Sequence, residues 1–380
     1  MHVLILGNGY PSIYQPLDGI FTRDQAEALA KKIEKVGLIS ISPISIKDFI
    51  KKKKLSLGSD YFNEKGVNTY VFRYLNPPKF SNYSIYKAKN KGIKLFVNYI
   101  KTHGIPNVIH VHCYQAGLLA IEIKRLYNIP FVLTEHSSNF LTGLVPHKHF
   151  LLINRILEYS SINIAVSINL KDRISEQFLN EFVYVPNIVD TDFFSPIINI
   201  PKDKKFTFFH AANLNRNKNQ KDLILAFDSF LKYQSESQLI IAGMGDMIDE
   251  LIELATSLNI INKVRFLGYL TRDEILYWYR VSNVFVLTSF NETFGVVLIE
   301  ALSCGIPVVS TYSGGPSSII LNDELGELTE INSASIFLGM KKVYINFAKY
   351  NSENIRNFVI DNFSENIITN KLLDIYNRVV

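Results

Sequence analysis

Two glutamates separated by seven residues, Glu292 and Glu300, are the side chains of this 380-residue sequence best placed to do chemistry. Glu292 follows the short apolar run 284–288, which predicts a buried parallel strand. Glu300 lies inside the predicted helix 295–303 among apolar residues, where a carboxylate is costly unless it is hydrogen-bonded. A carboxylate accepts hydrogen bonds from adjacent hydroxyl groups, so both residues are candidates for binding a polyol.

The loop between the two acids also carries backbone groups that suit an anion. Thr293, Phe294, Gly295 and Val296 stand at the predicted helix start, where N–H groups lack helical partners and favour phosphate. The next strand is predicted at 307–311, which makes a β-loop-α-β unit. Its loop lies at the carboxyl end of a parallel strand, where open α/β sheets bind ligands. The alternative is a solvated loop acid and a helical acid that reaches water.

The motif resembles a known family. With its flanks, S-x-x-E-x-F-G before and E-A-x-x-C-G-x-P-V-V after, it closely resembles the E-x7-E segment of retaining GT-B glycosyltransferases of family 4. The resemblance implies an α/β fold of two doubly wound, Rossmann-like domains facing across a cleft. Residues 1–195 would bind the acceptor and 205–361 the nucleotide-diphospho-sugar, with a linker at about 195–205. The tail 351–380 is predicted helical, and its last part, about 362–380, would return to the first domain.

Five residues are assigned catalytic or donor-binding roles by this resemblance. Glu292 would hold the hydroxyls of the transferred sugar and Glu300 those of the ribose. Lys218 matches the lysine that grips the donor diphosphate. Asn213 stands where the family usually has arginine, and Arg216, three residues on, is a candidate substitute. The alternative for Arg216 and Lys218 is a solvated loop.

Further donor contacts are implied along the chain. Gly19, before a predicted helix, would approach the donor closely. Gly243 falls in a segment similar to the family's I-x-G-x-G, and the backbone of Tyr269 and Leu270 would cradle the nucleobase. A dinucleotide fingerprint is disfavoured, because Gly7-x-Gly9 has no third glycine.

Two histidines stand at the carboxyl ends of predicted strands. His112 and His136 would therefore line one cleft, although a lone histidine is more often structural. By resemblance His112 lies beside the transferred sugar and acts in catalysis, while Glu135 and His136 lie on the acceptor side. Domain closure would bring Gly19 and His112 onto the sugar.

Charge is uneven along the chain. The formal net charge is +5, yet residues 47–101 alone hold 13 basic and 3 acidic residues, net +10. This region is either a solvated face or a contact for an anionic membrane or a lipid-linked pyrophosphate sugar. Nucleic acid is not expected, because no nucleic-acid motif accompanies the charge.

Cysteine use and local patterns give further expectations. The two cysteines predict reduced thiols and a cytoplasmic protein. A membrane contact through the basic residues 47–101 would place it at the inner face of the cell membrane. No Cys/His cluster has zinc spacing. The resemblance implies that no D-x-D metal site is needed, and neither a metal nor a cofactor is expected besides the nucleotide-sugar co-substrate. The pattern also predicts a helix over 21–36 that stops at Gly37, followed by a strand over 38–44.

The resemblance implies a metal-independent hexosyltransferase. It would move a sugar onto a saccharide or lipid-linked saccharide during exopolysaccharide, capsule or lipopolysaccharide synthesis. Two alternatives stay open: a nucleotide-sugar 2-epimerase of the same fold, and a non-catalytic partner subunit. The presence of Glu292, Glu300 and Lys218 disfavours the partner subunit, and the missing arginine at 213 favours it.

Overall fold

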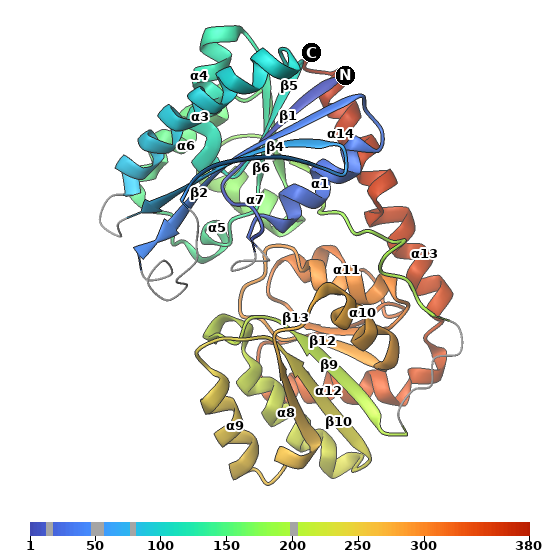
Figure 1. Cartoon of the computed structure of the whole chain (residues 1–380). Coiled ribbons are helices and arrows are strands. Elements are labelled where there is room, and N and C mark those ends of the chain that lie inside the picture. The colour runs from blue at the N-terminus through green and yellow to red at the C-terminus, as the bar shows by residue number, and fades with distance from the viewer. Residues whose placement is uncertain (13–17, 47–56, 77–80, 198–203) are drawn as a thin grey trace. The chain divides into compact units, whose positions relative to one another are not determined.

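The computed structural model describes residues 1–12, 18–46, 57–76, 81–197 and 204–380, with the backbone alone for 81–84. The chain divides into two compact units (Figure 1). The first consists of Met1–Val166, Lys171–Ile188 and Ile368–Val380, and the second of Ser167–Leu170 and Val189–Ile367. Each unit is built on its own sheet.

The sheet of the first unit has eight strands in the order β3-β4-β2-β1-β5-β6-β7-β8. All neighbours pair in parallel except the edge strand β3, which is antiparallel to β4. The strands are β1 (His2–Gly7), β2 (Lys35–Ser45), β3 (Gly58–Glu64), β4 (Val67–Asn76), β5 (Val108–His112), β6 (Phe131–Glu135), β7 (Ile162–Ala165) and β8 (Val183–Tyr184).

Helices cover both faces of this sheet, which is why its central strands are continuous apolar runs. Figure 1 shows α3, α4 and α6 on one side of the sheet and α1 and α14 on the other. The helices of this unit are α1 (Ile20–Ala30), α3 (Ser81–His103), α4 (Gly117–Tyr127), α5 (Asn139–Thr142), α6 (Phe150–Tyr159), most of α7 (Ile168–Phe178) and most of α14 (Glu365–Asn377).

The predicted end of the first helix is wrong. Helix α1 ends at Ala30, and strand β2 begins at Lys35, so Gly37 lies within the strand. A Cβ at Gly37 would collide with the phenol ring of Tyr99 on α3. This glycine therefore serves the contact between a helix and the sheet, a requirement that local sequence does not reveal.

The sheet of the second unit has six parallel strands in the order β11-β10-β9-β12-β13-β14. A buried core formed by α8, α9 and α12 covers one face, and α11 packs with α13 on the other. The elements are β9 (Phe206–Ala211), β10 (Ser237–Ala242), β11 (Val264–Gly268), β12 (Val284–Leu287), β13 (Val308–Thr311), β14 (Gly326–Thr329), α8 (Gln220–Tyr233), α9 (Ile248–Ser257), α10 (Arg272–Val281), α11 (Val296–Ser303), α12 (Ser333–Ile345) and α13 (Ser352–Phe363).

Apart from the short segment Ser167–Leu170, the chain passes from the first unit to the second at Ile188/Val189, earlier than the predicted boundary at 195. Arg356 donates hydrogen bonds to the backbone oxygens of Thr191 (2.8 Å) and Phe194 (3.0 Å), which ties this segment to the second unit. Of the expected linker 195–205, residues 198–203 lie outside the described part of the chain.

The C-terminal helix α14 belongs mostly to the first unit. The hydroxyl of Tyr376 on this helix lies 2.6 Å from Nδ1 of His110 in β5, and both side chains are buried. The tail is therefore anchored to the centre of the first sheet.

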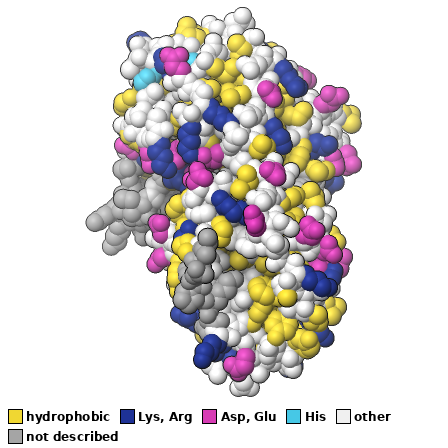
Figure 2. Space-filling view, turned by 90° about the vertical axis from the view of Figure 1, so that its right-hand side faces the viewer, with side chains coloured by type: hydrophobic (Ala, Val, Ile, Leu, Met, Phe, Trp, Pro, Cys, Tyr) yellow, Lys and Arg dark blue, Asp and Glu magenta, His cyan; other side chains and the backbone are white. Residues whose placement is uncertain are grey.

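The surface carries mixed charges on the face drawn in Figure 2, where basic and acidic side chains alternate. None of the helices in the described part of the chain is long and apolar enough to cross a bilayer. The basic run Lys51 to Lys54 lies outside the described residues.

Candidate active site

The carboxyl ends of the neighbouring strands β9 and β12 carry the predicted donor-binding residues. The loops after these strands, 212–219 and 288–295, are hydrogen-bonded to each other. Thr288 Oγ1 donates to the backbone oxygen of Lys218 (3.0 Å), and the Phe290 N–H donates to that of Asn217 (2.8 Å). Residues separated by about 70 positions in sequence are thereby held at one sheet edge.

Lys218 and Glu292 meet at this edge. Lys218 Nζ lies 2.6 Å from Glu292 Oε2, and their side chains are 21% and 16% exposed. Ser289 Oγ donates to the same oxygen at 3.2 Å. The hydrogen bonds given to this carboxylate by described residues use Oε2, so Oε1 is left to accept from a ligand.

The helix start after Glu292 has the geometry of an anion site. Gly295 caps α11 in the left-handed conformation (φ 100°), and the Leu298 N–H donates to the Gly295 oxygen at 2.9 Å. The N–H groups of Val296 and Val297 precede this first helical bond and have no helical carbonyl to bond to. The partial positive charge of a helix N-terminus favours a phosphate there.

A second glycine holds this loop in place. A Cβ at Gly315, on the turn after β13, would collide with the backbone of Phe294. The Gly315 N–H donates to the Glu292 oxygen (2.7 Å), and the Glu292 N–H donates to the Ser313 oxygen (2.8 Å). The backbone on both sides of the Glu292 side chain is therefore fixed.

Glu300 is half-buried on α11. The hydroxyl of the buried Tyr279 lies 3.0 Å from Glu300 Oε2 and 3.2 Å from the Val297 oxygen. Burial, and then the nearby carboxylate, raise the pKa of Tyr279 well above its usual value. The phenol stays protonated and can anchor one carboxylate oxygen from the protein interior.

The remaining predicted donor residues surround the same sheet edge. Asn213 and Arg216 are both exposed, on the loop that carries Lys218. Gly243 has φ 135°, and a Cβ there would collide with the Ala212 oxygen, so a glycine is required where two loops touch. Tyr269 (45% exposed) and the half-buried Leu270 follow β11.

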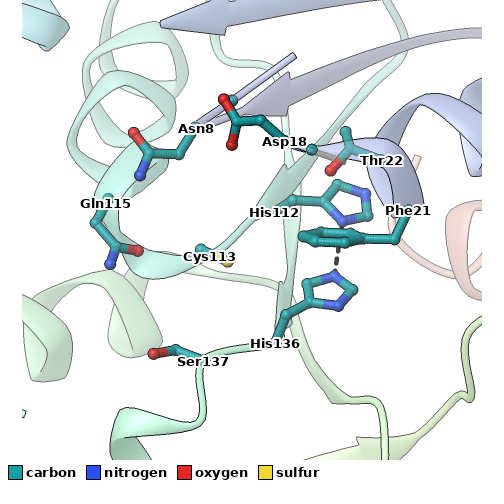
Figure 3. Close-up of a pocket in the computed structure, with 11 residues that line it drawn as sticks. Asn8, Asp18, Phe21, Thr22, His112, Cys113, Gln115, His136 and Ser137 are labelled. Carbon is teal, nitrogen blue, oxygen red and sulfur yellow. Dashed lines mark hydrogen bonds between the residues drawn. The ribbon is translucent and has the colours of Figure 1, made fainter. Parts of the chain in front are cut away.

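The first unit has a cavity of about 260 Å³ at the carboxyl ends of β1 and β5. Figure 3 shows side chains from several loops converging on it. The two histidines that were expected to line one cleft, His112 and His136, both lie there, and so does Gly19. The lining residues are Asn8, Gly9, Asp18, Gly19, Phe21, Thr22, His112, Cys113, Gln115, His136 and Ser137.

The two histidines of this cavity are hydrogen-bonded to each other. His112 Nδ1 lies 2.9 Å from His136 Nε2, and the Phe21 ring stacks on His136 with centroids 4.1 Å apart (Figure 3). Burial lowers the pKa of His112 to about 3, and burial together with His112 lowers that of His136 well below its usual value. Both imidazoles are therefore neutral near pH 7.

Two buried polar atoms of the cavity-lining residues have no hydrogen-bond partner in the described part of the chain. They are Nε2 of His112 and Oε1 of Gln115. A buried polar atom left unpaired costs about 1–3 kcal/mol. This arrangement favours a ligand with hydroxyl groups, which could satisfy both atoms.

Glu135 does not line the cavity. Its buried carboxylate accepts hydrogen bonds from the backbone N–H groups of Tyr114 (3.0 Å), His136 (2.9 Å) and Ser137 (2.9 Å). It thus positions the loops that carry the cavity residues. Gly19 does line the cavity, with φ 64°, and a Cβ there would collide with the Gly9 oxygen.

Sequence reasoning missed two residues that support or line these sites. His210, buried in β9, has Nδ1 2.9 Å from the Val286 oxygen and Nε2 3.1 Å from the Gln220 amide nitrogen, which also donates to the Asn213 oxygen. Gln115 lines the first-unit cavity. The polar residue at the end of an apolar strand was a signal for His210, whereas Gln115 carried none.

No group of three or more histidine, cysteine, aspartate or glutamate residues that could hold a metal ion occurs within the described ranges. Cys113 and Cys304 are both free thiols.

The folds of the two units, with polar loops gathered at the carboxyl ends of parallel strands, define a GT-B protein. The family models agree: one for glycosyl transferases group 1 matches residues 190–346, and one for glycosyltransferase family 4 matches 55–193. The chain belongs to the group 1 glycosyltransferases and is a transferase enzyme. The predicted fold class, family and enzyme class are thus confirmed.

Individual relatives resemble nearly the whole chain. An uncharacterized glycosyltransferase of Methanocaldococcus jannaschii is 27% identical over 340 residues, covering 83% of this chain and 86% of that protein. Sucrose-phosphate synthase from Thermosynechococcus elongatus superposes with a TM-score of 0.77 at 18% identity, over 100% and 99% of the two chains. HepE of Anabaena in complex with UDP-glucose superposes with a TM-score of 0.73 at 16% identity, over the whole of both chains.

Proposed function

We propose that this protein is a retaining, metal-independent hexosyltransferase that takes its sugar from a nucleotide-diphospho-sugar. It transfers that sugar to a saccharide or lipid-linked saccharide during synthesis of a bacterial surface polysaccharide, and it needs no cofactor. The observation that carries the proposal is the Lys218–Glu292 pair beside the N-terminus of α11. This arrangement offers one cation, one set of backbone donors and one carboxylate to the same ligand.

The donor would lie along the strand ends of the second unit. Its diphosphate meets the ammonium of Lys218 and the N–H groups at 293–296, with Arg216 reaching in from the same exposed loop. The free Oε1 of Glu292 accepts from hydroxyls of the sugar, and Glu300 accepts from those of the ribose. The HepE structure with bound UDP-glucose makes UDP-hexoses the first donors to test.

Transfer breaks the bond between the anomeric carbon and the phosphate oxygen. The acceptor hydroxyl attacks from the same face, and its proton passes to the departing phosphate oxygen, so the anomeric configuration is retained. Lys218 and the helix N-terminus stabilise the charge that develops on the diphosphate. Removing one such preorganised donor typically costs about 2.7–4 kcal/mol of barrier.

The acceptor would bind at the first-unit cavity, with His112 and His136 on its wall. Neutral imidazoles suit this task, because each can donate or accept a hydrogen bond with a hydroxyl without carrying a buried charge. A lipid-linked acceptor would place the enzyme at the inner face of the cell membrane. The excess of basic residues in 47–101 supports such a peripheral contact.

The test is nucleotide release from UDP-, GDP-, ADP- and dTDP-sugars, with EDTA and without acceptor. Slow release from one donor, unaffected by EDTA, is expected and would identify base and sugar together. Conversion of the donor to an epimer would instead reveal a 2-epimerase. If no donor turns over and no nucleotide shifts the melting temperature, the proposed donor site is wrong.

A further inference from the structure

Helices α3 and α6 of the first unit border a hollow of about 250 Å³ that is both apolar and basic. It is lined mainly by Tyr86, Leu118, Lys148, Leu151, Leu152 and Arg155, and is called the α3–α6 groove below. A second hollow of about 200 Å³ adjoins it through Tyr86 and adds Lys87, Lys91 and Lys94. The two hollows form one surface from segments more than 50 residues apart in sequence.

Exposed apolar side chains mark this surface. Leu151 is 85% exposed and Tyr86 58% exposed. Large apolar side chains gathered on one surface typically mark a binding site rather than ordinary exposure. A small soluble anion would leave these side chains in water.

The charge around the groove is positive. Helix α3 contains five lysines and no acidic residue. The exposed Lys94 lies on α3, the exposed Lys148 lies in the turn just before α6, and the exposed Arg155 lies on α6. Of the nearby acids, Glu122 on α4 is paired with Arg125 at 2.7 Å, and Glu158 on α6 is exposed.

We infer that the α3–α6 groove docks onto the surface of a bilayer that contains anionic phospholipids. Leu151 and Tyr86 enter the boundary between headgroups and acyl chains, while Lys94, Lys148 and Arg155 contact the phosphates. A basic surface with exposed apolar side chains binds membranes both by burying apolar area and by electrostatic attraction to anionic lipids. This inference rests on the proposed membrane-side function and assigns the contact to α3 and α6, not to the whole stretch 47–101.

The test is cosedimentation of the full chain with vesicles of phosphatidylcholine, with or without phosphatidylglycerol. Binding is expected only to the anionic vesicles, and it should weaken as salt rises. Lys94→Gln/Arg155→Gln and Leu151→Asn should each weaken partitioning by about tenfold or more. Donor turnover is measured in the same preparations without vesicles, so failure of the proposed function and failure of this inference are told apart.

Two control variants match these changes on other surfaces of the first unit. Lys371→Gln/Arg378→Gln removes the same charge from two exposed positions, one within α14 and one directly after it, and Leu179→Asn replaces another leucine that is 92% exposed. Both should bind like the wild type. Equal binding by groove and control variants would overturn the inference, as would equal binding to neutral vesicles. Binding to RNA but not to anionic vesicles would also overturn it.

Discussion

Lys218 Nζ and Glu292 Oε2 lie 2.6 Å apart although the two residues are 74 positions apart in the chain. The pair exists because β9 and β12 are neighbours in the sheet and their following loops are hydrogen-bonded to each other. Each side chain thus holds the other at the place where the diphosphate and the sugar are proposed to bind.

Lys218→Ala should lower kcat by about 10²–10³ while changing the free energy of unfolding by no more than about 1 kcal/mol. The reason is that the ammonium opposes charge on the departing diphosphate, whereas a partly exposed ion pair adds little stability. Steady-state kinetics and chemical denaturation measure the two effects. Lys232→Ala, which breaks the surface pair with Asp228, is the matched control. Near wild-type transfer by both Lys218→Ala and Glu292→Ala would show that the site is elsewhere.

Gly315→Ala should abolish tight donor binding. The added methyl group collides with the backbone of Phe294, displacing the loop before α11, and overpacking of this kind costs about 1–3 kcal/mol of stability. Gly104→Ala is the control, because Gly104 has φ 82° but open space around it. It should also lose stability, yet keep its donor affinity in calorimetry. Equal donor affinity in the two variants would exclude Gly315 as the support of the phosphate site.

If Glu300 binds the ribose hydroxyls, the enzyme should distinguish a ribonucleotide donor from its 2′-deoxy analogue. The wild type should prefer the ribonucleotide donor over its 2′-deoxy analogue by about tenfold or more in kcat/KM, because a hydrogen bond to a charged group is lost. Glu300→Gln should reduce this preference to a few-fold, and Glu324→Gln, at an exposed loop position, should not change it. Retention of the full preference by Glu300→Gln would assign ribose recognition to another residue.

Gln115→Leu should separate acceptor binding from stability. Oε1 of Gln115 is buried without a partner in the described structure, so its removal should leave the melting temperature unchanged or higher. The acceptor KM should rise, since the leucine cannot bond to a hydroxyl. Gln238→Leu is the opposite control: it loses the 2.9 Å bond to Thr207 Oγ1 and should be less stable with an unchanged acceptor KM. An unchanged acceptor KM in Gln115→Leu would remove Gln115 from the acceptor site.

Stability should fall as pH falls below about 6.5. Burial lowers the pKa of His210 to about 4 and that of His112 to about 3, so between these values and 6.5 the unfolded chain binds more protons than the folded one. In that pH range, each such histidine lowers the free energy of unfolding by about 1.4 kcal/mol for each unit by which the pH falls. Denaturation at pH 7, 6 and 5 measures the slope. His210→Asn should make the slope shallower, and His147→Asn, at an exposed position, should not. An unchanged slope in His210→Asn would mean that His210 binds protons equally in the folded and the unfolded chain.

Much of the fold is encoded locally. The predicted strand 284–288, helix 295–303 and strand 307–311 correspond to β12, α11 and β13 of the structure. Thr271 and Glu274 have the spacing of a capping box, and at the start of α10 the Thr271 side chain does accept from the Glu274 N–H. Signals of this kind depend on residues a few positions apart, so a single sequence contains them.

The predictions from sequence were wrong where segments that are far apart in the chain pack against each other. Gly37 resembles a helix stop, but it allows Tyr99 to approach β2. The short edge strand β3 was not predicted, because its side chains are mostly exposed and show no apolar alternation. The tail was predicted as helical throughout, whereas Ser364 (φ −62°, ψ 154°) separates α13 from α14.

The sequence by itself determined the family, the alternation of strands and helices, and the chemical types at the donor site, because motif spacing and hydrophobic periodicity are local properties. Only the tertiary structure decided which of these residues meet. Strand order brought Lys218 to Glu292 and His112 to His136, and it turned the Glu135 carboxylate towards three backbone N–H groups and away from the cavity. The physical reason is that hydrogen-bonded strands and buried side chains select partners in space, whatever their separation in the chain.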